Sequence, residues 1–317
     1  MAGPASAALR FLPIASRRAG GFNWWMLCHK IGLIGVGLLG GSLGLAIKER
    51  RLAERVEGYV RRPASVEECD QLGVTDQTSL DLASVVADAD LLVLCTPIAQ
   101  MRGLVERMRP SLKPGATVTD VGSVKASVVS ELEPLVAASG AHFVGSHPMA
   151  GAEKMGARHA RADLFQDAVC AVTPTKRTPA EGLRRLKELW RGVGAKVLRL
   201  SPDVHDELVS RSSHLPHVVA AELANYVLSP AHSKEQAVLC ANGFRDTTRI
   251  ASGSPEMWRD IVVANRNHLV RVLGVFIEDL QEFSHALSNG QDSAITEFFE
   301  KAKQRRDAWC AESHSPE

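Results

Sequence analysis

Short apolar runs alternate with stretches of helical spacing over the first two thirds of the chain. Seven runs are rich in aliphatic and β-branched residues, and most are followed by Gly, Pro or Ser: Lys30–Gly35, Val56–Val60, Asp90–Thr96, Ala116–Val121, Ala141–Ser146, Val169–Thr173 and Ala195–Leu200. A repeating order of strand, helix and strand is typical of a parallel sheet with helices on both faces. With right-handed crossovers, the pattern predicts an α/β fold with a doubly wound, Rossmann-type parallel sheet.

The pattern changes after Ser201. Apolar residues then recur at intervals of three and four, which is the spacing of one face of a helix. The predicted helices are Asp203–Ser210, His217–Leu228, Lys234–Cys240, Met257–His285 and Ala294–Ala308. We therefore expect two domains, an α/β domain over residues 30–200 and an all-helical domain over residues 201–317.

The helical stretch around Asn267–Leu280 carries apolar residues on more than one side. Such a helix is either shared with a partner chain or central to its own domain. We favour a homodimer that forms through the helical domain. The alternative is a buried central helix in a monomer.

Composition and charge narrow the classes of partner. Lys and Arg number 37 and Asp and Glu number 36, and the net charge of +1 gives no reason to expect a nucleic acid or an anionic membrane as partner. An anionic small molecule would have to be bound by a local group of cations. No apolar run reaches the ~18 residues that span a bilayer, and the six cysteines lack close spacings. These features predict a soluble protein of a reducing compartment, the cytoplasm.

Residues 1–29 are predicted to be a leader or an extension outside both domains. No Asp or Glu occurs before residue 49, while Arg10, Arg17 and Arg18 lie among Ala, Ser and Gly. An Arg-rich stretch without acids can be an organelle transit peptide. We favour the alternative, a disordered extension or a start codon assigned too early, because Met26 lies just before the first predicted strand.

A glycine loop directly follows the first predicted strand and opens a helix. It reads Gly35-Val-Gly37-Leu38-Leu39-Gly40, and in this context the spacing predicts dinucleotide binding. Gly35 would form the turn, Gly37 would let the backbone approach the pyrophosphate, and Gly40 would let helix and strand pack closely. The diphosphate would lie at the helix N-terminus, where free N–H groups favour anions. Leu38 and Leu39 therefore belong to the predicted cofactor contacts.

The residues after the second predicted strand bear on the choice between NAD and NADP. NAD-selective domains place an Asp or Glu there to bind the ribose 2′-hydroxyl. This chain has Val60 followed by Arg61 and Arg62. Two cations without an acid suit a 2′-phosphate, so we favour NADP over NAD; the alternative is that both arginines are solvated turn residues. Thr96, at the end of the third predicted strand, completes the predicted cofactor contacts.

Several further segments carry residues that could take part in catalysis or in substrate binding. In chain order they are Asp120-Val-Gly-Ser123-Val-Lys125, Gly145-Ser-His147-Pro-Met-Ala-Gly151 with Glu153, Ser213-His214-Leu-Pro-His217, Gly243-Phe-Arg245-Asp246-Thr-Thr-Arg249-Ile-Ala251 and Met257-Trp-Arg-Asp260. Together with the glycine loop they resemble the prephenate/arogenate dehydrogenase family over roughly residues 30–285. The resemblance implies NAD(P)-dependent oxidative decarboxylation of prephenate to 4-hydroxyphenylpyruvate in tyrosine biosynthesis. The alternative is an arogenate dehydrogenase, or a dual cyclohexadienyl dehydrogenase.

Two residues are the predicted catalytic pair. Ser123 and His147 each follow a predicted strand, which places both at the carboxyl edge of the sheet, where open α/β folds bind ligands. A histidine beside proline in a loop can also be purely structural. The resemblance implies that His147 is the base that removes the hydroxyl proton and that Ser123 shares the hydrogen bond to the ring hydroxyl. Because a free imidazole charges near pH 6.5, we expect the rate to fall below that pH.

The substrate would need cations for its two carboxylates. Arg249 is the candidate for the side-chain carboxylate because its planar guanidinium binds carboxylates bidentately, and Asp246, one helical turn earlier, could hold it in position. The alternative is a structural Asp–Arg pair. The resemblance adds His217 facing the pocket, His214 in support and Glu153 in an ionic network. No metal is predicted, because the two histidines lack the further ligand spacing of a zinc site.

Two other classes of protein fit less well. The β-hydroxyacid dehydrogenases, which resemble this architecture, carry a catalytic lysine in the helical half and lack a block like Gly145–Gly151. A non-catalytic nucleotide sensor would not need Ser123, His147 and Arg249 together. Two histidines and an arginine near the substrate side chain favour prephenate over arogenate.

Overall fold

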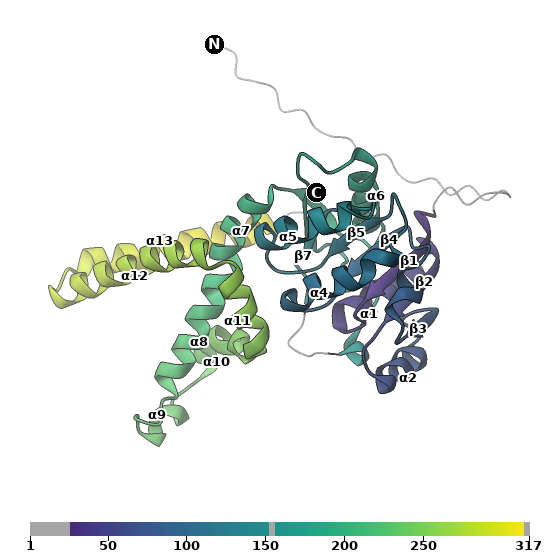
Figure 1. The fold of residues 1–317 in the computed structure, drawn as a ribbon. Coiled ribbons are helices and arrows are strands. Elements are labelled where there is room, and N and C mark those ends of the chain that lie inside the picture. Colours follow the sequence, from purple (N-terminus) through teal and green to yellow (C-terminus); the bar gives the residue numbers. More distant parts are fainter. Residues whose placement is uncertain (1–25, 152–155, 314–317) are drawn as a thin grey trace, which may run out of the picture.

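The computed structural model describes residues 26–151 and 156–313. Figure 1 shows an α/β part that contains all the strands and two groups of helices that extend away from it. The predicted leader lies almost entirely outside the described residues, and so does Glu153. The first strand begins at Cys28, two residues before the predicted start of the α/β domain.

The main sheet is fully parallel. Its strands are β1 (Cys28–Ile34), β2 (Ala53–Tyr59), β3 (Gln77–Ser79), β4 (Leu91–Leu94), β5 (Thr117–Asp120) and β6 (His142–Phe143). Their spatial order is β3-β2-β1-β4-β5-β6. This is the order of a dinucleotide-binding, doubly wound sheet, which confirms the predicted fold class. Strand β3 was not predicted, because three residues without an apolar run give no periodic signal.

Both faces of this sheet are covered. Its helices are α1 (Leu38–Glu49), α2 (Pro63–Leu72), α3 (Leu82–Val86), α4 (Ile98–Met108), α5 (Ala126–Ala137) and α6 (Ala180–Gly192). Because strand side chains alternate between faces, Leu91 and Val93 join one apolar cluster with α1 and α6, whereas Leu92 and Leu94 join a second cluster with α3, α4 and α5. This two-sided burial is why the strands read as continuous apolar runs.

A second, smaller sheet contains β7 (Gly145–Pro148), β8 (Val169–Thr173) and β9 (Lys196–Arg199). The prediction of one strand over Ala141–Ser146 is therefore wrong. The Val144 N–H still donates to the Val118 carbonyl (2.9 Å), after which the chain leaves the main sheet and β7 pairs antiparallel with β8. His147 consequently lies within a strand, not after one.

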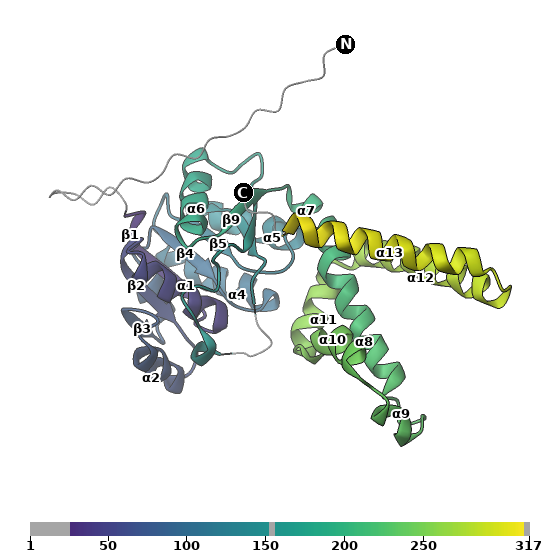
Figure 2. The ribbon, with the colours of Figure 1, turned by 180° about the vertical axis from the view of Figure 1, so that it is seen from behind.

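After β9, every described regular element is helical. These elements are α7 (Pro202–Val209), a π-helical turn η3 (Ser210–His214), α8 (Leu215–Val227), α9 (Lys234–Val238), α10 (Asn242–Thr248), a 3-10 turn η4 (Arg249–Ser252), α11 (Pro255–Ala264), α12 (Arg266–Ser288) and α13 (Asp292–Ser313). Figure 2 shows that α12 and α13 run side by side as one projection and that α8 to α11 form another. No helix among the described residues combines the length and apolarity needed to cross a membrane.

The long helix predicted over Met257–His285 is interrupted. Helix α11 ends at Ala264 and α12 begins at Arg266. Asn265 between them is buried, and its side-chain amide donates to the Asp206 carbonyl at 2.8 Å. A contact between residues far apart in sequence therefore accompanies this break. The apolar spacing continues on both sides of Asn265, so the sequence pattern does not reveal it.

Helix α12 is not enclosed within the monomer. Leu269 is buried, but Val270 is 67% exposed and Ile277 is 50% exposed. Further large apolar side chains on α12 and α13 face solvent, among them Val275, Leu280, Leu287 and Phe299. The alternative of a buried central helix in a monomer is therefore wrong.

Candidate active site

The glycine loop joins β1 to α1 with little free space on one side and open space on the other. Gly35 adopts a φ of 99°, a region that favours glycine, and its N–H donates to the Tyr59 carbonyl at 2.9 Å. A Cβ atom on Gly40 would lie 2.1 Å from the Gly35 carbonyl oxygen. A Cβ atom on Gly37 would meet nothing within 4 Å. The loop thus packs tightly at Gly40, whereas the space beside Gly37, at the start of α1, is open.

The residues around this loop fit a dinucleotide. Helix α1 has no side-chain cap, so its first N–H groups are free for an anion, while the Leu38 side chain is buried and that of Leu39 packs against the core. Among the described residues, the buried Thr96 Oγ1 atom has no hydrogen-bond partner. Thr96 follows β4, the neighbour of β1, where the direction of strand order reverses and such sheets bind ligands. An open backbone, free amides and an unpaired hydroxyl suit a diphosphate.

Arg61 and Arg62 are exposed at the carboxyl end of β2, on the edge of the sheet that carries the glycine loop. Arg62 is the residue before the first turn of α2, and Pro63 opens that helix. Both guanidinium groups can therefore reach solvent near the second strand. Their contact with a 2′-phosphate stays a prediction.

His147 lies in β7 with only 8% of its surface exposed. Its Nδ1 atom is 2.9 Å from Nε2 of His205. Burial, together with the neighbouring His205 ring and the charge of Lys125, holds the pKa of His147 well below its usual range. The imidazole is therefore neutral at pH 7. Ser123, half-buried, lies in the loop between β5 and α5.

A buried ion pair connects this loop to β7. The Lys125 ammonium donates to the Asp120 carboxylate and to the Ser146 carbonyl (2.8 Å), and the Ser146 N–H donates to Asp120 at 3.2 Å. Both side chains of the pair are completely buried. Ser146, the residue before His147, therefore contacts both Lys125 and Asp120. Because Lys125 lies two residues after Ser123, the ion pair joins the loop of Ser123 to β7.

His205 and Asp206 are part of this site, and sequence reasoning missed them. The His205 Nδ1 atom is 2.8 Å from Asp206 Oδ1. Asp206 also accepts the backbone N–H groups of Lys125 (2.7 Å) and Ala126 (2.8 Å) at the start of α5. Helix α7 thus connects directly to the α/β part. In sequence these two residues lie in a stretch with ordinary helical spacing, and only an adjacent His and Asp could have marked them.

The structure brings His214 and His217 together against Trp258. The His217 ring stacks on the Trp258 ring at 3.7 Å between centroids, and its Nδ1–H donates to the Ser213 carbonyl at 2.9 Å. His214 is fully buried and accepts a hydrogen bond from Asn265 at 3.1 Å. Burial lowers the pKa of His214 to about 4 and also lowers that of His217, so both rings are neutral at pH 7.

Arg249 and Asp246 lie elsewhere on the helical part. Both are exposed, Asp246 in α10 and Arg249 at the start of η4. Arg249 lines a surface cavity of about 480 Å³ with Arg245 and Thr248. His147 and His205 do not line this cavity. The predicted roles of Arg249 and Asp246 therefore remain predictions, as does that of Glu153.

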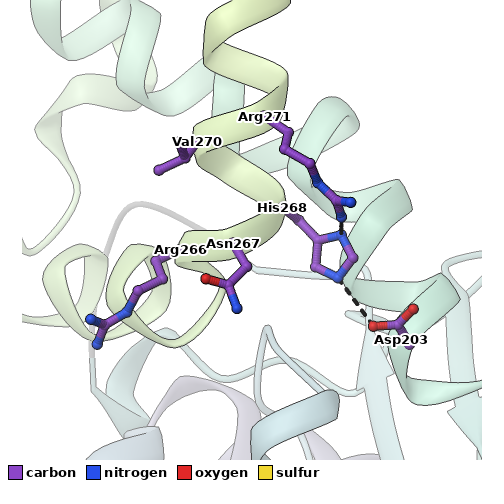
Figure 3. Close-up of a pocket in the computed structure, with 6 residues that line it drawn as sticks. All are labelled: Asp203, Arg266, Asn267, His268, Val270 and Arg271. Carbon is purple, nitrogen blue, oxygen red and sulfur yellow. Dashed lines mark hydrogen bonds and ion pairs between the residues drawn. The ribbon is translucent and has the colours of Figure 1, made fainter.

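Another hollow of about 570 Å³ lies where α12 meets α7 (Figure 3). His268 bridges two charged groups there: its Nε2 atom is 3.2 Å from Asp203 Oδ1, and Arg271 donates to its Nδ1 atom at 2.8 Å. Ser123 and His147 do not line this hollow. This hollow is therefore separate from the predicted catalytic pair.

Two family models match consecutive parts of the chain. Residues 43–199 match the nucleotide-binding domain of prephenate dehydrogenase, and residues 201–301 match its dimerization domain. Together the two matches cover most of both structural parts described above.

Individual proteins agree with these matches. The chain is 35% identical to a prephenate dehydrogenase of Bacillus subtilis, over 87% of this chain and 74% of that protein. It is 32% identical to a cyclohexadienyl dehydrogenase of Zymomonas mobilis, over 87% and 94%. The crystal structure of prephenate dehydrogenase from A. aeolicus, in complex with hydroxyphenyl propionate and NAD+, superimposes with a TM-score of 0.83 at 30% identity, over 88% of this chain and 98% of that one.

Proposed function

The chain belongs to the prephenate dehydrogenase family, and on that basis we propose that it oxidises and decarboxylates prephenate to 4-hydroxyphenylpyruvate. It is an NAD(P)-dependent oxidoreductase of this family. The observation that carries the proposal is the buried, neutral imidazole of His147 in β7, a strand that Lys125 joins to the loop of Ser123 through the Ser146 carbonyl. The alternative substrate is arogenate, which has an amino group in place of the side-chain keto oxygen.

His147 is the proposed general base. A dinucleotide bound at the glycine loop supplies the hydride acceptor. Because neutral imidazole has a lone pair at pH 7, His147 can take the proton of the ring hydroxyl as the carbinol is oxidised. The resulting ring ketone can lose the ring carboxylate as CO2, because the products of that bond cleavage include an aromatic ring. Ser123 would share the hydrogen bond to the oxygen of the ring hydroxyl.

His217, His214 and Arg249 are the proposed contacts of the substrate side chain. His217 donates its Nδ1–H to the Ser213 carbonyl and stacks on Trp258, and both contacts fix the orientation of its ring. His214 has a buried Nε2 atom without a partner among the described residues. Arg249 would supply the charge that a carboxylate needs, with Asp246 and Glu153 around it.

NADP is the proposed preferred dinucleotide. Arg61 and Arg62 are both exposed after β2, and no carboxylate stands at the end of that strand to bind a ribose 2′-hydroxyl. A guanidinium group suits the additional phosphate of NADP. Use of NAD is the alternative.

A second copy of the chain is the proposed partner of the helical part. Helices α12 and α13 expose apolar side chains such as Val270, Ile277 and Phe299, which would be buried in a homodimer. This segment lies within the match to a dimerization domain. Light scattering of the purified chain should give twice its mass of 34.2 kDa. A monomer at micromolar concentration would contradict the proposal.

The decisive experiment offers both substrates with both dinucleotides. Purified protein is assayed for reduced dinucleotide and for CO2 with prephenate or arogenate, each with NAD+ or NADP+. We expect the highest kcat/KM for prephenate with NADP+. A higher value for arogenate would reassign the substrate, and no turnover of either compound would refute the proposed activity.

A further inference from the structure

Three buried side chains form a continuous hydrogen-bonded chain that begins at the proposed base, His147. The Nδ1 atom of His147 faces Nε2 of His205 at 2.9 Å, and Nδ1 of His205 faces Asp206 Oδ1 at 2.8 Å. Their exposed fractions are 8%, 1% and 1%. His147 belongs to β7, and the other two belong to α7. At these distances, each of the two contacts must be a hydrogen bond with one hydrogen between its two atoms.

Asp206 fixes the direction of its hydrogen bond with His205. Its carboxylate already accepts backbone N–H groups from Lys125 (2.7 Å) and Ala126 (2.8 Å), at the N-terminus of α5. Both carboxylate oxygens of Asp206 therefore already act as hydrogen-bond acceptors. An ionised carboxylate has only acceptor atoms. The hydrogen between His205 and Asp206 must therefore be on Nδ1 of His205.

The same reasoning continues to His147. When the single ring hydrogen of His205 is on Nδ1, its Nε2 atom is an acceptor. His147 must then donate from its own Nδ1, because the other tautomer would place two lone pairs face to face at 2.9 Å. The Nε2 atom of His147 keeps its lone pair and is the atom free to take a proton.

We propose that Asp206 and His205 are positioning residues that hold His147 in the tautomer whose Nε2 atom acts as the base. The reaction they serve is the one under Proposed function, on which this inference rests. When Nε2 takes the ring hydroxyl proton, His147 becomes a cation that still donates from Nδ1 to His205. Asp206 then places a negative charge at the far end of the chain, which stabilises that cation. In serine proteases, loss of the comparable Asp contact leaves the wrong tautomer and lowers kcat about 10⁴-fold.

The tautomer can be measured without turnover. Histidine labelled with ¹⁵N is incorporated into the full chain, and long-range ¹H–¹⁵N correlation spectra at neutral pH distinguish a protonated Nδ1 from a protonated Nε2. The His147 signal is identified by its absence in His147→Asn. We expect His147 with hydrogen on Nδ1. Hydrogen on Nε2 would overturn the proposal, because it would mean that His205 is the donor in the shared bond.

Two substitutions of His205 separate positioning from packing. His205→Gln can place its Oε1 atom near the former Nε2 atom and so keep an acceptor for His147, whereas His205→Phe keeps a ring and removes the acceptor. For His205→Phe we expect kcat to fall at least tenfold, KM for substrate and dinucleotide to stay within about threefold, and the His147 signal to lose its Nδ1 form. His205→Gln should retain the tautomer and most of kcat. Equal kcat values in both variants would overturn the proposal.

His268→Phe is the matched control. His268 also contacts an aspartate of α7, Asp203, but at the hollow in Figure 3, away from His147. It should leave the His147 tautomer unchanged, and a change there would overturn the assignment to His205. Because the spectra need no substrate, they decide the tautomer even if the protein turns over neither prephenate nor arogenate. Absence of turnover would refute the proposed function alone.

Discussion

Asp120 and Lys125 form an ion pair in which both side chains are completely shielded from solvent. Lys125 also donates to the Ser146 carbonyl, next to His147. Burial lowers the pKa of Lys125, and the carboxylate of Asp120 opposes that shift. The pair therefore holds the loop of the candidate site at the cost of desolvating two charges.

Removal of one partner of this pair should destabilise the fold strongly. In Lys125→Met the Asp120 carboxylate loses its cation but stays buried, and such a loss costs about 3–5 kcal/mol. Urea unfolding measures it. The double variant Asp120→Asn/Lys125→Met should recover part of the loss. As a control, Lys303→Met removes an exposed pair with Asp307 and should leave stability unchanged. Equal midpoints for Lys125→Met and the wild type would contradict this role.

The acid limb of the rate should lie below pH 6.5. The sequence alone predicts a fall near 6.5, but burial and the neighbouring His205, Lys125 and His214 lower the pKa of His147. A base with a lowered pKa stays unprotonated, and so active, at pH values where a free imidazole is already charged. The profile of kcat/KM at saturating dinucleotide tests this. A limb at or above 6.5 would show that His147 is not the titrating base.

Gly37 and Gly40 should respond differently to the same added methyl group. Gly37→Ala places a Cβ atom in open space at a φ of −96°, so the fold should stay intact while the dinucleotide Kd rises about tenfold or more. Gly40→Ala clashes with the Gly35 carbonyl and should lower stability by about 1–3 kcal/mol. Calorimetric binding and thermal unfolding separate the two effects. Unchanged dinucleotide affinity in Gly37→Ala would place the diphosphate elsewhere.

Arg61→Ala tests the preference for NADP. Loss of a guanidinium from a 2′-phosphate removes a charge-assisted hydrogen bond worth about 1.5–3 kcal/mol. We expect KM for NADP+ to rise at least tenfold and KM for NAD+ to change less than twofold. Arg184→Ala, on the exposed face of α6, is the control. A parallel change for both dinucleotides would mean that Arg61 does not recognise the 2′-phosphate.

Arg249→Ala should act on substrate binding more than on turnover. If its guanidinium pairs with the substrate carboxylate, KM for prephenate should rise about 10- to 100-fold, with kcat changed less than fivefold. Arg249→Lys should lie between, because lysine keeps the charge but lacks the planar fork. Steady-state kinetics measure both, again with Arg184→Ala beside them. A loss confined to kcat would remove Arg249 from the carboxylate.

The sequence by itself determined the class of fold and the position of the glycine loop. Both depend on local properties: apolar runs, helical spacing, and glycines between a strand and a helix. The turn at Gly35 therefore took the predicted form, whereas the approach of a pyrophosphate to Gly37 stays a prediction. His147 and Ser123 could also be singled out, because their motifs are short and contiguous.

Only the tertiary structure decided the surroundings of His147. The split between β6 and β7, the break at Asn265 and the contact from His147 to His205 join segments that lie far apart in sequence. Local spacing carries no signal for such contacts. The pKa of a histidine depends on what covers it and on which charges face it, so the tautomer and pKa of His147 follow from packing between the α/β part and helix α7.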